Sequence, residues 1–162
     1  MLGTNDNSDN DQELGDSRVR ILLDQLKLSY QIDDNKDFVI AFGIKEDALS
    51  DDDETRTQIA IISSDTHHIG DFEVRHIFSI GYEAIGELPR NVANALLIMN
   101  DNVKLGAWKA IHVKKDGQDG MVAAFQAQVA ADTDAQSLFT TLMAVCATAD
   151  DVENKLTGED RF

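Results

Sequence analysis

The chain has little of several features that would assign it to a particular class of protein. Cys146 is the only cysteine among 162 residues, so an internal disulfide is excluded, which suits a reducing compartment such as the cytoplasm. No apolar run approaches the ~20 residues of a membrane helix. The polar first residues also lack the basic start and apolar run of a secretory signal. We therefore expect a soluble, cytoplasmic protein.

Basic residues are scarce as well. The chain holds 14 lysines and arginines against 30 acids, which gives a net charge of −16. Such a surface repels phosphate backbones and anionic membranes, so we expect neither nucleic acid nor a membrane as a partner. The acidic excess is spread over many segments, which favours a role in solubility over recognition of one basic partner.

The length fits one domain with a core that needs neither disulfides nor metal. Residues 1–16 hold five acids, no base and no periodic apolar residue, and they predict a disordered acidic tail. The run Asp51-Asp52-Asp53-Glu54 lies in a second acidic segment, which predicts an exposed loop at residues 45–56. We therefore expect a single domain over residues 17–158.

Apolar periodicity predicts the elements of this domain. Spacings of three and four predict a helix from Ser17 to about Leu28, with Asp16 or Ser17 as its cap. Three strands are expected at residues 38–44, 57–64 and 72–80, with an extended piece at Gln31-Ile32. A second helix is expected over residues 89–103, a hairpin of two strands around Asp116-Gly117, and a closing helix capped by Asp134.

The order of these elements is helix, three- to four-strand meander, helix, two-strand hairpin, helix. Only two of the links between strands contain a stretch that favours a helix. The pattern therefore predicts an α+β fold with an antiparallel sheet and argues against a doubly wound parallel sheet.

No catalytic motif is present in the sequence. It has no Gly-rich phosphate loop and no nucleophile elbow. Cys146 lies on the apolar stripe of the closing helix, which indicates a buried, unreactive thiol. We therefore expect no enzyme, no catalytic residue, no cofactor and no bound metal.

The histidines leave one alternative open. His67 and His68 are adjacent in a predicted loop between Asp65 and Asp71, a set that a small metal-dependent hydrolase could use. Adjacent side chains diverge in extended chain, which disfavours joint chelation. His76 lies on the alternating apolar face of the strand at residues 72–80, so we expect it to be a hydrogen-bonded histidine of the core.

The basic residues gather mildly around the hairpin. Lys104, Lys109, Lys114 and Lys115 form a local patch without the interleaved aromatic residues of a nucleic-acid surface. Trp108 is the only tryptophan; a core position against the second helix is the default interpretation, and an interface position is the alternative.

Three segments carry a family resemblance. Residues 92–100, with the sequence VANALLIMN, are followed by KLGAW at 104–108 and by the Asp116-Gly117 turn. Together they resemble the YbjN-like bacterial proteins over roughly residues 16–156. That family is similar in fold to the type III secretion chaperones, and the resemblance implies a cytoplasmic, homodimeric, non-enzymatic protein.

The resemblance and the apolar pattern lead to one functional hypothesis. We expect a protein-binding module, chaperone-like or regulatory, that acts as a homodimer. The expected interaction residues are Leu96, Met99, Trp108 and Phe125. A structural subunit of a larger complex is a further alternative, since it differs from a binding module only in how permanently the partner stays bound.

Overall fold

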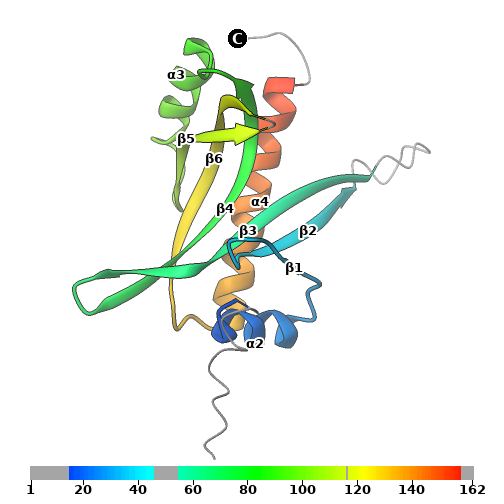
Figure 1. The fold of residues 1–162 in the computed structure, drawn as a ribbon, viewed down its shortest axis with the longest axis vertical. Coiled ribbons are helices and arrows are strands. Elements are labelled where there is room, and N and C mark those ends of the chain that lie inside the picture. Colours follow the sequence, from blue (N-terminus) through cyan, green and yellow to red (C-terminus); the bar gives the residue numbers. More distant parts are fainter. Residues whose placement is uncertain (1–14, 46–54, 116, 158–162) are drawn as a thin grey trace, which may run out of the picture.

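One antiparallel sheet packs against three helices in the computed structural model, which describes residues 15–45, 55–115 and 117–157 (Figure 1). The elements, in chain order, are α2 (Ser17–Leu26), β1 (Gln31–Ile32), β2 (Phe38–Lys45), β3 (Thr55–Ile69), β4 (Phe72–Ile85), α3 (Arg90–Met99), β5 (Ala107–Lys115), β6 (Gln118–Ala130) and α4 (Ala135–Thr157). The predicted α+β class and the antiparallel sheet are confirmed. None of these helices has the length and apolar character needed to span a membrane.

The six strands lie in the order β1-β2-β3-β4-β6-β5. The first four form a meander. In the hairpin that follows, the second strand, β6, pairs with β4, and β5 becomes an edge strand. The side chains agree with this order: β6 carries the consecutive buried residues 122–125, as an interior strand does, whereas β5 carries lysines, which are typical of an edge.

The core lies between the sheet and the long helix α4. One stripe of α4 is buried, and it includes Leu138, Leu142, Cys146, Ala149 and Val152 as predicted. This stripe packs mainly on β4 and β6, while α2 and α3 lie near opposite ends of α4 (Figure 1). The predicted caps of the first and last helices are also present: Asp16 accepts a hydrogen bond from the Arg18 amide, and Asp134 accepts one from Ser137.

The ladder between β3 and β4 ends where the two strands separate, after the pair Ala60–Ser79. Side chains replace the missing backbone bonds at this point. The amide of Gln58 donates to Ser79 Oγ at 2.7 Å and to the Ile80 carbonyl at 3.1 Å, and Ser79 Oγ donates to the Ile59 carbonyl. These hydrogen bonds allow the polar side chains of Gln58 and Ser79 to be buried among apolar residues.

Two predictions about the β3–β4 hairpin are wrong. The strand β3 continues to Ile69, so the segment that holds His67 and His68 is strand instead of loop, and the turn is only Gly70-Asp71. The β4 residues that point into the core include Arg75 and Ile77, so His76 lies on the opposite face and is only partly buried. The alternating apolar residues of β4 lie mainly on the face that no described helix covers. Periodicity shows that such a face exists, but it does not show which face of the strand a helix will cover.

The predicted acidic tail and acidic loop fall largely outside the described residues, which begin at Gly15 and omit residues 46–54. At the end of the predicted tail, Asp16 is part of the folded domain. The first helix ends at Leu26, two residues before the expected position, because Lys27 takes a left-handed conformation with φ of 57°.

Candidate functional site

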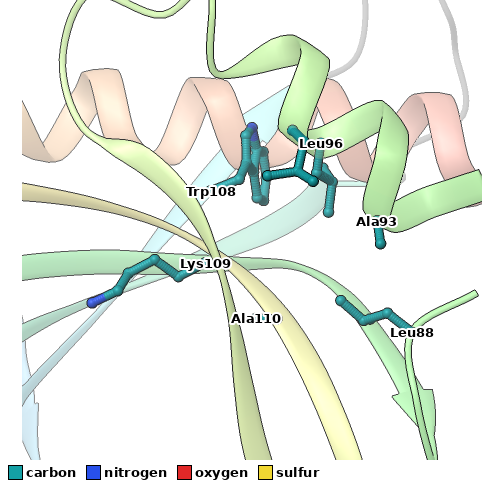
Figure 2. A pocket seen from close by; sticks show the side chains of 7 residues that line it. Leu88, Ala93, Leu96, Trp108, Lys109 and Ala110 are labelled. Carbon is teal, nitrogen blue, oxygen red and sulfur yellow. The ribbon is translucent and has the colours of Figure 1, made fainter. Parts of the chain in front are cut away.

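A small apolar cavity lies between α3 and the edge strand β5 (Figure 2). Its volume is about 160 Å³. The lining comes from the segment before α3, from α3 and from β5: Leu88, Ala93, Leu96, Leu97, Trp108, Lys109 and Ala110. The helix supplies its lining at a spacing of three to four residues, so one face of α3 forms the wall.

Trp108 forms the inner wall of this cavity. Its side chain is 6% exposed, and its ring lies 5.4 Å from that of Phe125, centre to centre. Gly81 lets the indole approach β4, because a Cβ there would lie 2.6 Å from the ring. The indole N–H is buried without a hydrogen-bond partner among the described residues, which is a costly state for a donor.

Asn100, directly after α3, is hydrogen-bonded to the outer edge of β5. Its Oδ1 accepts from the Trp108 amide at 2.7 Å, and its Nδ2 donates to the Trp108 carbonyl at 3.4 Å. The backbone groups of Trp108 therefore point away from β6. In an antiparallel pair the N–H and C=O groups of every second residue point to the same side. The backbone groups of Ala110, His112 and Lys114 therefore also point away from β6. The described part of the chain places no strand on that side of β5.

The edge strand β5 is basic in an acidic protein. Lys109, Lys114 and Lys115 lie within it, and the strand contains no acid. Lys115 is paired with Glu83 at 3.2 Å, and Lys114 lies 4.0 Å from Asp119 with both side chains largely exposed. Lys109 donates to the amide oxygen of Gln126, and its ammonium group points away from the other side chains that line the cavity (Figure 2).

Apolar side chains continue from the cavity onto the surface of α3. Leu97 is 68% exposed and Ile98 is 69% exposed, and Leu105 follows in the connection to β5. Exposed apolar side chains that adjoin an apolar cavity are typical of a binding surface.

The structure brings two of the four predicted interaction residues together in this cavity. Leu96 and Trp108 line it, whereas Phe125 is buried behind Trp108 and Met99 is partly buried against the core. The core position expected for Trp108 is confirmed. Leu97 was not predicted from the sequence, although an apolar residue outside the apolar stripe of a helix can indicate a binding surface. No sequence pattern indicated the contact between Asn100 and β5.

The histidines do not form a metal centre. His67 lies against His76 of β4, with 4.8 Å between ring centres, and His76 Nε2 is 2.9 Å from the side-chain amide of Gln128. Burial, followed by the nearby charge of His67, lowers the pKa of His76 below its usual value. No group of three histidine, cysteine or carboxylate side chains placed to hold a metal occurs in the described ranges. The predicted set of His67, His68, Asp65 and Asp71 therefore does not converge.

Cys146 is buried, as predicted, in the stripe of α4 that packs on the sheet. Burial, with a smaller contribution from Asp150, raises the pKa of its thiol to about 12. A thiol in this state is a poor nucleophile at neutral pH.

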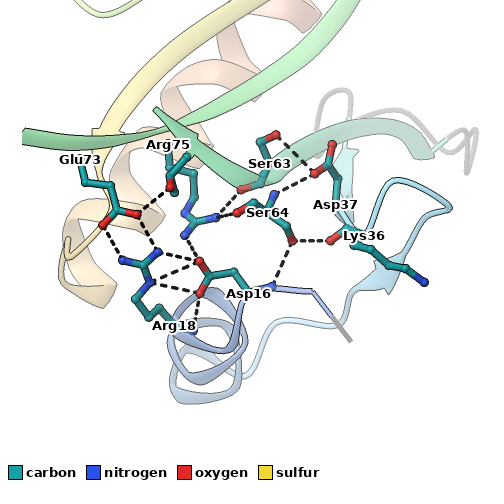
Figure 3. A network of polar contacts seen from close by, with 9 residues as sticks. Asp16, Arg18, Lys36, Asp37, Ser63, Ser64, Glu73 and Arg75 are labelled. Carbon is teal, nitrogen blue, oxygen red and sulfur yellow. Dashed lines mark hydrogen bonds and ion pairs between the residues drawn. The ribbon is translucent and has the colours of Figure 1, made fainter. Parts of the chain in front are cut away.

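A polar network at the opposite end of α4 from the cavity fixes α2 to the sheet (Figure 3). The guanidinium of Arg75, 2% exposed, donates to Asp16 and to the carbonyls of Ser63 and Ser64. Arg18 bridges Asp16 and Glu73. Partial burial acts to raise the pKa of Asp16, but hydrogen bonds from Arg18 and Arg75 outweigh it and lower that pKa to about 2. Each charge is matched within the fold, so the network is a structural tie.

The face of the sheet opposite α4 carries an apolar patch on β2, β3 and β4. Val39, Ile61 and Phe78 lie in one cross-strand row, and Ile59 and Ile80 beside them are 47% and 41% exposed. A hollow of about 350 Å³ beside them is lined by Val39, Thr57, Gln58, Ile59, Ile61 and Ile80 of the strands and by Glu153 of α4. No helix in the described stretches covers this face, which we call the open sheet face (Figure 1).

Comparison of the chain with protein-family models and with curated proteins finds no match in either. The resemblance to the YbjN-like proteins therefore stays a prediction.

Proposed function

We propose that this chain is a non-enzymatic protein-binding module, chaperone-like or regulatory, that acts as a homodimer. The observation that carries the proposal is the free edge of β5 beside an apolar cavity. Unpaired backbone groups accept an added strand, and a pocket next to them takes one of its side chains, which is how sheet edges bind extended segments. The exposed Leu97 and Ile98 extend the same surface.

The open sheet face supports the homodimer. Its apolar side chains adjoin one another on β2, β3 and β4, and exposed apolar patches mark interaction surfaces. Two such faces packed together would give a sandwich with about 10 Å between the sheets. The strand residues at the centre of the layer, Ile59, Ile61 and Ile80, are aliphatic, and Glu153 of α4 is the one charged residue that lines the hollow beside them.

Light scattering at micromolar concentrations tests the homodimer. We expect a dimer for the wild-type chain and a monomer for the double variant Ile59→Lys/Ile80→Lys, because two charges in the centre of the layer oppose burial. Ile21→Lys is the matched control, since Ile21 lies on α2 and is 63% exposed. A monomeric wild type, or a dimer insensitive to the double variant, would refute the assignment of the open sheet face.

The binding function is tested separately at the cavity. Partner proteins retained by the immobilised wild-type chain should be lost on Leu97→Glu and kept on Ile21→Lys, because only Leu97 borders the cavity. Equal retention by both variants would contradict a binding role for this surface.

A further inference from the structure

Two of the four histidines lie side by side on the open sheet face. Arg75 and Ile77 point into the core, so His76 between them on β4 points to the open sheet face. Val74 shares that face with His76, and His67 of β3 is the cross-strand neighbour of Val74. The rings of His67 and His76 are 4.8 Å apart, centre to centre. The open sheet face therefore carries two adjacent imidazoles, each of which can gain a proton.

The histidine pair borders the apolar patch that the proposed homodimer buries. Phe78, in the same cross-strand row as Val39 and Ile61, is two residues from His76 on the same face, a distance of about 7 Å. A stable dimer buries about 800 Å² on each partner, which is a disc with a radius of about 16 Å. An interface of that size around Phe78 therefore covers both histidines.

The contacts of His76 suit its neutral form. Its Nε2 is 2.9 Å from the side-chain amide nitrogen of Gln128. An amide nitrogen donates, so Nε2 accepts this hydrogen bond, as it does in a neutral imidazole. Burial, followed by the nearby charges of His67 and Lys109, lowers the pKa of His76 below its usual value. A second copy over this face would bury His76 further and would lower that pKa again.

The strands β5 and β6 bring a cation and amides to the pair. Lys109 of β5 donates to Gln126, and Gln128 of β6 contacts the ring of His76 itself. Lys109 raises the electrostatic cost of a proton on His76, as His67 does once it is protonated.

The acids of the neighbouring elements are placed differently. Glu73 lies on the other face of β4, where Arg18 is its partner. Asp65 is exposed in the bulge of β3, where water screens its charge. Glu153 of α4 lines the hollow beside Ile80, at the far end of the apolar patch from the histidines. Protonation of Glu153 would remove a negative charge and favour association, which is the opposite of the effect expected for the histidines.

We propose that the pair of His67 and His76 makes the homodimer dependent on pH, with association when the imidazoles are neutral and separation when they are protonated. This inference rests on the proposed homodimer and adds its regulation. The separated chain binds protons that the dimer excludes, so association weakens as the pH falls below about 6.5, the usual pKa of histidine.

The sign of this effect is opposite to that of the overall charge. Protonation of histidines makes a chain with a net charge of −16 less negative, which by itself reduces the repulsion between two copies. Weaker association at lower pH therefore does not follow from the overall charge and points to groups within the interface.

Analytical ultracentrifugation of the full chain at pH 7.5 and at pH 5.0 measures the Kd of the dimer. We expect the Kd to rise at least about tenfold at pH 5.0, since two copies that each exclude one proton can lose up to about a hundredfold in affinity per pH unit. Circular dichroism at both pH values confirms that the chain stays folded.

Variants locate the effect. The Kd of His67→Gln/His76→Gln, which keeps polar side chains of similar size, should differ less than about threefold between the two pH values. The matched control is His68→Gln/His112→Gln, because His68 lies on the other face of β3 and His112 shares the face of Trp108 on β5. This control should keep the full pH response. His67→Gln alone, at an exposed position, does not alter the packing of His76 and should show a smaller response than the wild type.

The outcomes separate this inference from the homodimer itself. A dimer at both pH values with an unchanged Kd overturns the pH dependence and leaves the homodimer standing. A pH response that persists in His67→Gln/His76→Gln assigns the effect to other groups and also overturns the inference. A wild-type chain that is monomeric at pH 7.5 overturns both proposals.

Discussion

Removing the charge of Asp16 is the sharpest test of how the fold holds α2. Asp16 is the carboxylate partner of Arg75, whose side chain is 2% exposed, with 2.5 Å between nitrogen and oxygen. Asp16→Asn keeps the size and the capping ability of the side chain, because asparagine is also a favoured N-cap. The variant therefore removes the negative charge and leaves the buried guanidinium with only carbonyl acceptors.

Two estimates set the size of the effect. Breaking a fully buried ion pair costs about 3–5 kcal/mol, and the Asp16 side chain keeps 15% exposure and Arg75 keeps two carbonyls, so the cost here is smaller. The lowering of the Asp16 pKa from 3.8 to about 2 corresponds to about 2.4 kcal/mol at about 1.36 kcal/mol per pH unit, which solvent screening reduces to about 1–2 kcal/mol. We expect a loss of about 2 kcal/mol in the free energy of unfolding.

Urea unfolding at pH 7 measures this loss, and thermal unfolding should show a decrease in Tm of about 4–8 °C. Asp132→Asn is the control, because Asp132 is exposed and outside the network. A change below about 0.5 kcal/mol for Asp16→Asn, or an equal change for the control, would refute the reasoning.

The pH dependence gives a second readout of the same pair. The folded-state pKa of Asp16 is depressed, so the unfolded chain binds the proton first and the stabilisation is present above about pH 4. It is lost as the pH falls through about 2. The difference in stability between wild type and Asp16→Asn should therefore shrink between pH 4 and pH 2, and a difference that is constant over that range would contradict the assignment.

Three further outcomes are expected. Asn100→Ala should lower the free energy of unfolding by about 1–2 kcal/mol in urea titrations, because it removes the acceptor of the Trp108 amide; an unchanged midpoint would contradict this role. Gly81→Ala should cost about 1–3 kcal/mol and shift the tryptophan emission, because the new Cβ would lie within 3.1 Å of the indole and of the Ala149 carbonyl; a silent variant would show that the indole moves freely. Cys146 should resist a disulfide-exchange reagent at pH 8 in the native protein and react in urea, and rapid native labelling would contradict its burial.

Much of the fold follows from local sequence patterns. The three helices, the order of elements and the buried stripe of α4 were predictable because a helical stripe and an alternating strand each leave a short-range signature. The caps at Asp16 and Asp134 were visible for the same reason. The position of His76 was not predictable, because apolar residues alternate on the face of β4 that no described helix covers.

The candidate site was only partly visible in the sequence. Trp108 and Leu96 stood out by type and spacing, and the structure places both at the cavity. Their neighbour Leu97 and the contact of Asn100 with β5 depend on how α3 is laid across the edge of the sheet. That geometry involves residues brought together by the chain reversal after α3, which periodicity does not encode.

The sequence by itself determined an acidic α+β chain with an antiparallel sheet, a buried thiol and no catalytic motif, because composition and local periodicity express these properties directly. Only the tertiary structure decided that β6 lies beside β4, that β5 is therefore the basic free edge, and that one sheet face is open. The reason is that strand order and the choice of the covered face depend on the packing of the whole chain, in which α4 covers the sheet from one side and leaves the other apolar face without a helix in the described residues.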